Sequence, residues 1–173
     1  MSLTETRSLA ILDLFLKELE KEATTTRNIL AAVPNDKYDW RPHPKSMSVR
    51  QLATHIGELP GWIAVVIATD ELDFASKPYQ QQIIENTADL LAYFERCYVE
   101  GKEALGQATE EQLLQNWTLR SGEEIYSVST KEEVIRMSLS QLIHHRAQLG
   151  VFLRLLNVPL PGSYGPTADN TRF

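Results

Sequence analysis

The stretch SLSQLIHHRAQLG, from Ser138 to Gly150, places two adjacent histidines inside a segment whose apolar residues recur with helical spacing. His145 follows Leu142 by three positions and precedes Leu149 by four, so it belongs to the buried line of a helix. His144 lies about 100° further round the helix and points elsewhere. The apolar residues of that line are Ile135, Leu139, Leu142, Leu149, Phe152, Leu153 and Leu156. This helix therefore carries an imidazole on the face that it buries.

The same spacing predicts three more long helices, over about residues 8–33, 48–68 and 83–105. Thr130 opens the histidine-bearing helix, Glu133 completes its capping box, and the helix runs to about residue 156. Ser48 is the expected N-cap of the second helix. Pro60 is expected to kink that helix or to break it in two.

The segments between the helices carry turn residues or polar residues. Residues 70–80 are predicted to form a polar linker, and Thr109 to cap a short helical turn. Residues 116–129 are the strand-like part, a two-stranded hairpin with its turn at Gly122. A chain of 173 residues has the size of one ordinary domain. We therefore expect residues 1–173 to form a single all-α domain, a four-helix bundle with a small β-hairpin before the last helix.

Composition excludes several classes of protein. A formal charge of −6 and a pI near 5.2 argue against nucleic-acid binding as the main activity. No run of about 18 apolar residues is present, and the first residues do not resemble a secretory signal. Cys97 is the only cysteine, so no disulfide can form within the chain, and its place on an apolar line favours a core role over a nucleophilic one. We expect a cytoplasmic protein that contacts neither membrane nor nucleic acid.

Two more polar side chains accompany His145 on inward faces. Gln141 precedes it by one helical turn, and His55 lies one step from Ile56 on the inward side of the second helix. Burying such groups costs roughly 1–3 kcal/mol for each one that lacks a partner. Two interpretations remain open: a hydrogen-bonded polar cluster in the core, or a divalent metal held between the two helices. Imidazole suits Zn and Ni, whereas a neutral Gln oxygen is a poor ligand, so such a site would bind metal weakly.

Candidate substrate-binding residues lie near this site. Trp40 and Arg41 lie in the loop before the second helix, where an Arg and aromatics can receive an anionic thiol or substrate, although Trp40 can equally pack over the end of the bundle. Arg146 can reach a pocket, pair with a Glu or face water. The chain has no G-x-S-x-G elbow, P-loop or G-x-G-x-x-G, so triad hydrolases and nucleotide-binding proteins have no support.

Two separated segments, WRPHPKSMSVRQLATHIGELPGW and LIHHRAQLGVFLRLLNVPLPGSYGPTAD, together resemble the DinB/YfiT family of bacterial four-helix-bundle proteins. The resemblance covers most of the chain in order: a long first helix, a histidine on the second, a hairpin, and HHRAQ within the last helix. It implies a metal site of three histidines, of which His55 matches the first and His145 the third. Gln141 stands where the family pattern has the middle histidine, and His144 is adjacent but aimed differently.

Family members that are enzymes are metal-dependent thiol transferases or isomerases that use bacillithiol, mycothiol or glutathione. The resemblance therefore implies a metal, Zn or Ni, at His55, Gln141 and His145, with a low-molecular-weight thiol and a small-molecule substrate near Trp40, Arg41, His144 and Arg146. It also implies a homodimer. The family's "DNA damage-inducible" label describes expression and implies no contact with DNA.

Three hypotheses follow. The chain is a thiol S-transferase-type enzyme with a degenerate His/Gln/His metal site, or a non-catalytic bundle that binds a small molecule or protein with weak or no metal. In the third, the polar cluster is only structural.

Overall fold

The computed structural model describes residues 3–76 and 78–171, and their side chains from Ile11 onward. In chain order the elements are α1 (Leu3–Ala31), the 3-10 helix η1 (Asn35–Lys37), α2 (Val49–Ala68), β1 (Glu71–Asp73), α3 (Thr87–Gln107), α4 (Glu110–Leu113), β2 (Asn116–Ser121), β3 (Glu124–Thr130) and α5 (Lys131–Leu155). Over these residues the predicted four long helices are present, and the capped turn after α3 forms a fifth α-helix, α4.

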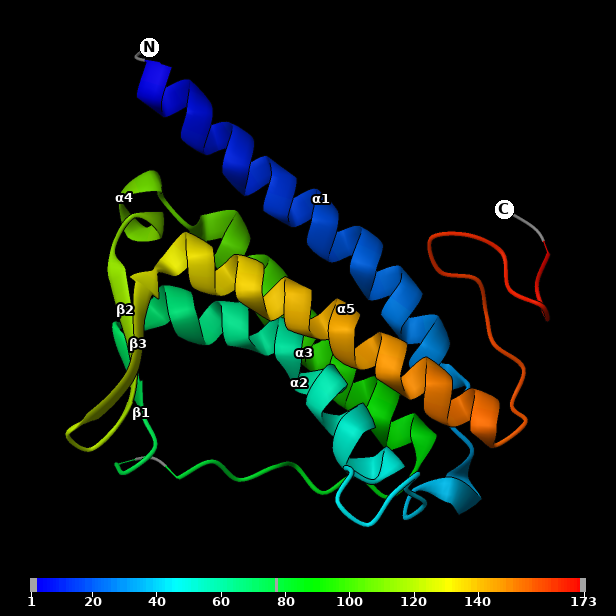
Figure 1. Ribbon diagram of the computed structural model, residues 1–173. Coiled ribbons are helices and arrows are strands. Elements are labelled where there is room, and N and C mark those ends of the chain that lie inside the picture. Colours follow the sequence, from blue (N-terminus) through cyan, green and yellow to red (C-terminus); the bar gives the residue numbers. More distant parts are fainter. Residues whose placement is uncertain (1–2, 77, 172–173) are drawn as a thin grey trace.

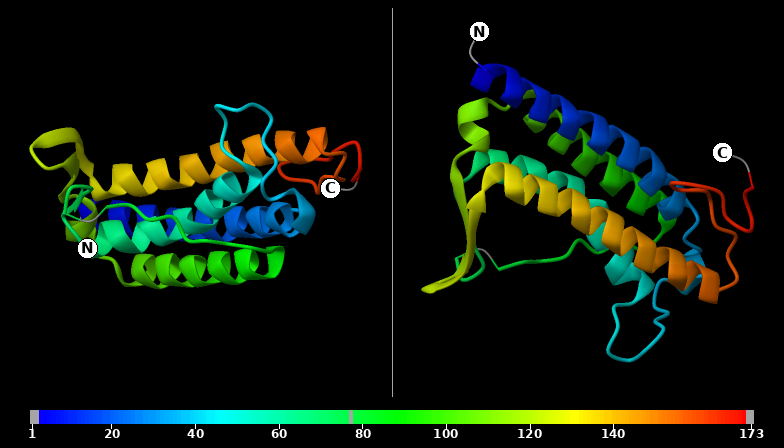
Figure 2. Two further views of the ribbon diagram at one scale, coloured as in Figure 1. Left: turned by 90° about the horizontal axis from the view of Figure 1, so that it is seen from below. Right: turned by 45° about the horizontal axis from the view of Figure 1, so that its top comes forward.

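The four long helices form a ring in which each packs on two neighbours. α2 packs against α3 and α5, and α1 packs against the same two helices from the other side. Figure 2 shows α5 and α3 on opposite sides of the bundle with α1 and α2 between them. The strands lie at the end of the bundle where α5 begins (Figure 1). The chain after α5 folds back beside α1 and α5.

Capping side chains set where the helices begin, as predicted at three of them. Ser48, Thr109 and Thr130 each accept a hydrogen bond from the backbone N–H three residues later, and each capping box is complete. α3 begins at Thr87 rather than near residue 83, because Asn86 caps it by accepting from the N–H of Asp89. Ile83 and Ile84, which were predicted to be helical, therefore lie outside the helix.

The predicted hairpin is part of a three-stranded sheet. β2 and β3 pair antiparallel, and Gly122 at their turn has φ +59°, a left-handed conformation that favours glycine. β1 pairs parallel with β2, so a strand lies within the segment that we expected to be a polar linker. Arg120 explains this addition, because its guanidinium binds the carboxylates of Glu71 and Asp73 on β1.

Helices α2 and α3 approach each other closely through small residues. A Cβ added at Gly101 of α3 would lie 2.1 Å from the carbonyl oxygen of Pro60, and one at Gly61 would lie 3.3 Å from the Cβ of Cys97. α2 remains a single helix through Pro60, and its ribbon changes direction part-way along its length, as expected of a helix with an internal proline (Figure 2). From α5, the hydroxyl of Ser138 donates a 2.8 Å hydrogen bond to the carbonyl of Leu59.

The core consists of two apolar clusters that divide along α2 at Pro60. One contains Leu30, Tyr38, Leu52, Ile56, Leu90, Phe94, Leu142, Leu149 and Leu153. The other contains Phe15, Leu19, Ile63, Val66, Leu105, Trp117, Ile135 and Leu139. The first cluster supports the histidine-bearing parts of α2 and α5. No helix of the described residues is long and apolar enough to cross a membrane.

We expect Gly101→Ala to destabilise the protein by about 2–3 kcal/mol, because its methyl group would overlap the Pro60 carbonyl and force α2 and α3 apart. Gly106→Ala, on the same helix, is the matched control, since a Cβ there meets no atom within 4 Å. Alanine should be neutral or stabilising at this second position. Urea unfolding of both variants measures the difference, and equal stabilities would contradict the close approach.

Candidate functional site

The imidazoles of His55 on α2 and His145 on α5 face each other across the bundle. Their ring centroids are 4.8 Å apart and the rings meet edge to face. Both side chains are partly buried, and each contacts a solvent-accessible cavity. The structure thus brings together two of the residues that the sequence placed on inward faces.

Each of these rings is held through its Nδ1 atom. His55 Nδ1–H donates to Oε1 of Glu58 at 2.6 Å, and His145 Nδ1–H donates to Oε1 of Gln148 at 2.8 Å. Both partners lie three residues further along the same helix, where helical geometry places side chains side by side. Among the residues that the structure describes, no hydrogen bond involves either Nε2. When the proton of a neutral imidazole is on Nδ1, the lone pair of its Nε2 is available to a ligand.

Glu58 is a member of the site that our sequence reasoning missed. Its side chain is only 9% exposed, and Oε1 accepts hydrogen bonds from both His55 and the hydroxyl of Tyr79 at 2.7 Å. Burial and the Glu58 carboxylate together raise the pKa of the Tyr79 phenol well above its ordinary value, so it stays a proton donor. The His-x-x-Glu spacing at positions 55 and 58 was the available signal.

Gln141 lies in the cavity beside this pair. That cavity has a volume of about 480 Å³, and Gln141 lines it together with His55, Glu58, Trp62, Phe74 and Tyr79. His145 lines a neighbouring cavity of about 400 Å³, and Met47 is common to both. The three predicted ligands thus lie around adjoining cavities between α2 and α5.

Electrostatics around His145 favour its neutral form. Burial lowers the pKa of His145, the hydrogen bond that its Nδ1–H donates to Gln148 opposes this shift, and the neighbouring imidazoles of His55 and His144 lower the pKa further. A neutral imidazole is the form that binds metals.

The fit of this site to a metal ion is partial. Two imidazoles on one tetrahedral zinc, with bonds of about 2.0–2.1 Å, have ring centroids about 5 Å apart, close to the separation seen here. Anchoring of each Nδ1 by a side-chain oxygen is the usual outer-shell arrangement of metal-binding histidines. Within the described residues, however, no group of three or more His, Cys, Asp or Glu side chains is placed to hold a metal. Gln141, the third predicted ligand, could contribute only a neutral amide oxygen, so the arrangement suits weak binding.

The other candidate substrate-binding residues are spread over the molecule. His144 is exposed, with its ring 5.0 Å from that of His145. Trp40 packs edge to face on Phe152 of α5 with centroids 5.7 Å apart, the packing role weighed as its alternative. Arg41 is exposed in the loop before α2.

Arg146 lies away from the histidines, on the side of α5 that faces α1. Its side chain is 4% exposed and forms a 2.6 Å ion pair with Glu22. It also donates to the carbonyl of Glu22, to the Thr26 hydroxyl and to the Tyr164 hydroxyl. Position 146 is one residue after position 145, which turns the side chain by about 100° round the helix and away from the site.

Comparison with known proteins agrees with this fold. The model of the DinB family matches residues 1–171. The chain belongs to the DinB family. YjoA from Bacillus subtilis, a DinB-like protein of solved structure, is 19% identical, with a TM-score of 0.68 over 92% of this chain and 99% of its own.

Two further solved structures share the fold at lower identity. YfiT from Bacillus subtilis, described as a probable metal-dependent hydrolase with an unusual four-helix bundle topology, is 13% identical, with a TM-score of 0.63 over 85% of this chain and 88% of its own. A mycothiol-dependent maleylpyruvate isomerase is 11% identical, with a TM-score of 0.58 over 80% of this chain and 60% of its own. These likenesses establish the fold of the DinB-family chain.

Removing one member of the buried ion pair should be costly. We expect Arg146→Met to lower the free energy of unfolding by about 3–5 kcal/mol, because Glu22 would keep a buried charge without its partner. Arg136→Met, at an exposed position of α5, is the control and should change stability little. Urea unfolding at pH 7 checks the pair, and similar losses in both variants would argue against a buried interaction.

Cys97 should be inert in the folded protein. Burial raises the pKa of its thiol to about 11, and the packing of α2 against α3 covers it. At pH 8 the thiol is protonated, so alkylation by iodoacetamide should be far slower in the native protein than in urea. Mass spectrometry over time measures both rates, and rapid native labelling would place the thiol at the surface.

Proposed function

We propose that this DinB-family protein is a metal-dependent enzyme of the thiol S-transferase type, with a degenerate site at His55, Gln141 and His145. The observation that carries the proposal is the matched anchoring of the Nδ1 atoms of two imidazoles whose ring centroids are 4.8 Å apart. Such hydrogen bonds fix the orientation and tautomer of metal-binding imidazoles. The metal-dependent and thiol-dependent relatives of the same fold support the class of chemistry.

A divalent ion such as Zn or Ni would be held by the two imidazoles and the Gln141 amide oxygen, and when bound it lowers the pKa of a thiol ligand. Glu58 holds the proton on Nδ1 of His55, and Gln148 does the same for His145. Tyr79 retains its phenolic proton beside Glu58 and can donate a hydrogen bond at the edge of the cavity.

The surrounding cavity supplies the binding surface for a small molecule. Trp62, Phe74 and Tyr79 line the cavity beside His55, and the amides of Gln51 and Gln81 provide hydrogen-bonding groups. A cavity of about 480 Å³ lies within the usual size range for small-molecule sites. We infer that the electrophilic substrate binds here and meets the thiol next to His55 and Gln141.

A second candidate is a non-catalytic bundle that binds a small molecule with little or no metal. Gln141 is the observation that favours it, because a neutral amide contributes far less to metal affinity than the histidine of the family pattern. In that case the cavity beside His55 would bind the small molecule with little or no help from a metal.

Metal titration distinguishes the two candidates without an activity assay. We expect the wild-type chain, purified without a metal-affinity tag, to bind Zn²⁺ with 1:1 stoichiometry in calorimetry and to lose binding in His145→Ala. Gln141→His should tighten binding by at least about tenfold, and Glu58→Gln should weaken it by about 10–100-fold. His43→Ala, which removes an exposed histidine of the loop before α2, is the matched control and should have no effect.

Two other outcomes would contradict the proposal of a metal-dependent enzyme. A wild-type chain that binds no metal, while Gln141→His binds it, would favour the non-catalytic bundle. Binding in neither would exclude a metal function for the site.

A further inference from the structure

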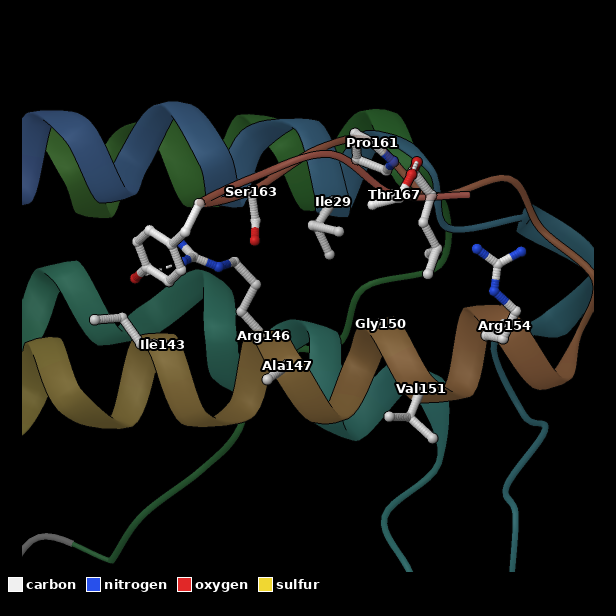
Figure 3. Close-up of a pocket in the computed structure, with 12 residues that line it drawn as sticks. Ile29, Ile143, Arg146, Ala147, Gly150, Val151, Arg154, Pro161, Ser163 and Thr167 are labelled. Carbon is white, nitrogen blue, oxygen red and sulfur yellow. Dashed lines mark hydrogen bonds between the residues drawn. The ribbon is translucent and has the colours of Figure 1, made fainter. Parts of the chain in front are cut away.

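A second cavity lies on the opposite flank of α5 from the histidines. It has a volume of about 440 Å³, opens to solvent, and is bounded by α5, by α1 and by residues 157–171 after α5, which we call the C-terminal strap. In Figure 3, Ala147 and Gly150 of α5 face the part of the strap that carries Pro161, Ser163 and Thr167, with Ile29 of α1 between them. The site of the proposed function uses none of these residues.

Small side chains keep this cavity open. A Cβ added at Gly150 would meet no atom within 4 Å, and Ala147 lies one turn away on the same cavity wall. A solvent-open hollow of about 440 Å³ with mostly apolar walls has the size and character of a small-molecule site. The apolar walls suit the hydrocarbon part of a ligand.

Polar contacts at both ends of the cavity hold the strap against α1 and α5. At one end the Tyr164 hydroxyl donates to Glu22 at 2.9 Å and accepts from Arg146 at 3.0 Å. At the other end Asp169 accepts from Arg154 and from the backbone N–H of Leu160. The cavity is therefore framed at two fixed points, about 12 Å apart along α5 for eight residues at 1.5 Å each.

The two arginines at these ends differ in what they can still bind. Arg146 is buried, and its two terminal nitrogens form hydrogen bonds or an ion pair with Glu22, Thr26 and Tyr164. Arg154 is 46% exposed, and among the described residues only Asp169 accepts from its guanidinium, through Nη2. Nε and Nη1 of Arg154 are thus free to bind a second anion at the mouth of the cavity.

We propose that this cavity binds a small amphipathic monocarboxylate, with its carboxylate on Arg154 and its hydrocarbon chain over Gly150 and Ala147 toward Tyr164. The apolar walls, the two-turn length and the single cation with uncommitted donors define this class of ligand. Asp169 shares the Arg154 guanidinium with the ligand and remains bound to the N–H of Leu160. The strap then acts as a fixed roof for the bound chain.

Calorimetric titration of the full chain with octanoate tests the proposal, with octanol and acetate as comparison ligands. Octanoate should bind saturably and at least about tenfold more tightly than either, because only octanoate can contact the apolar walls of the cavity and also bind Arg154 with a carboxylate. Arg154→Gln should bring octanoate down to the affinity of octanol and leave octanol unchanged. Arg136→Gln, an equal charge change on the exposed face of α5, should have no effect.

A second test of the proposal fills the cavity with a larger side chain. Gly150→Leu should weaken octanoate binding by at least about tenfold, since leucine favours the helix and occupies the space. Gly106→Leu, at an open position of α3, is the matched control. Ala147→Leu serves in its place should Gly150→Leu melt well below the wild type.

The proposal is overturned if octanoate fails to saturate, or if it binds both filled variants as tightly as the wild type. Equal loss in Arg154→Gln and Arg136→Gln would exclude the assigned carboxylate position. Loss of octanoate binding in His145→Ala, with Gly150→Leu unaffected, would place the ligand in the other cavity instead.

Discussion

The close contact between α2 and α3 constrains the rest of the bundle. The Pro60 carbonyl and the α-carbon of Gly101 leave no room for a side chain between them, so the two axes are fixed relative to each other at that point. Pro60 also divides the core into two clusters. The part of α2 that carries His55 and Glu58 therefore has its direction set by a backbone contact, one turn away from the site that it builds.

Helix α5 carries two polar side chains that point toward different neighbouring helices. His145 turns toward α2 and remains half-buried beside a cavity, whereas Arg146 turns toward α1 and is sealed against Glu22. A buried ion pair adds little net stability compared with apolar residues, but it penalises any arrangement that separates its partners. The Glu22–Arg146 pair thus fixes the rotation of α5 about its own axis, and that rotation aims His145 at His55.

Local signals predicted most of the fold. Apolar spacing and capping boxes located α2 and α5 almost to the residue, because both depend on neighbours within one helical turn. β1 was missed because Glu71 and Asp73 become a strand only through Arg120, far along the chain. For Arg146 the sequence offered a pocket, a Glu partner or solvent, because helical spacing gives an angle but does not identify the neighbouring element. Glu58 was overlooked because the search of the inward faces was for metal ligands, and Glu58 supports a ligand instead.

The partners of Glu22 have a consequence for biosynthesis. Glu22 belongs to α1, yet its ion-pair and hydrogen-bond partners, Arg146 and Tyr164, lie 124 and 142 residues later. Until α5 and the strap have been made, docking α1 in its native place would bury an unpaired carboxylate. Helix α1 therefore reaches its native place only after α5 and the strap have been synthesised.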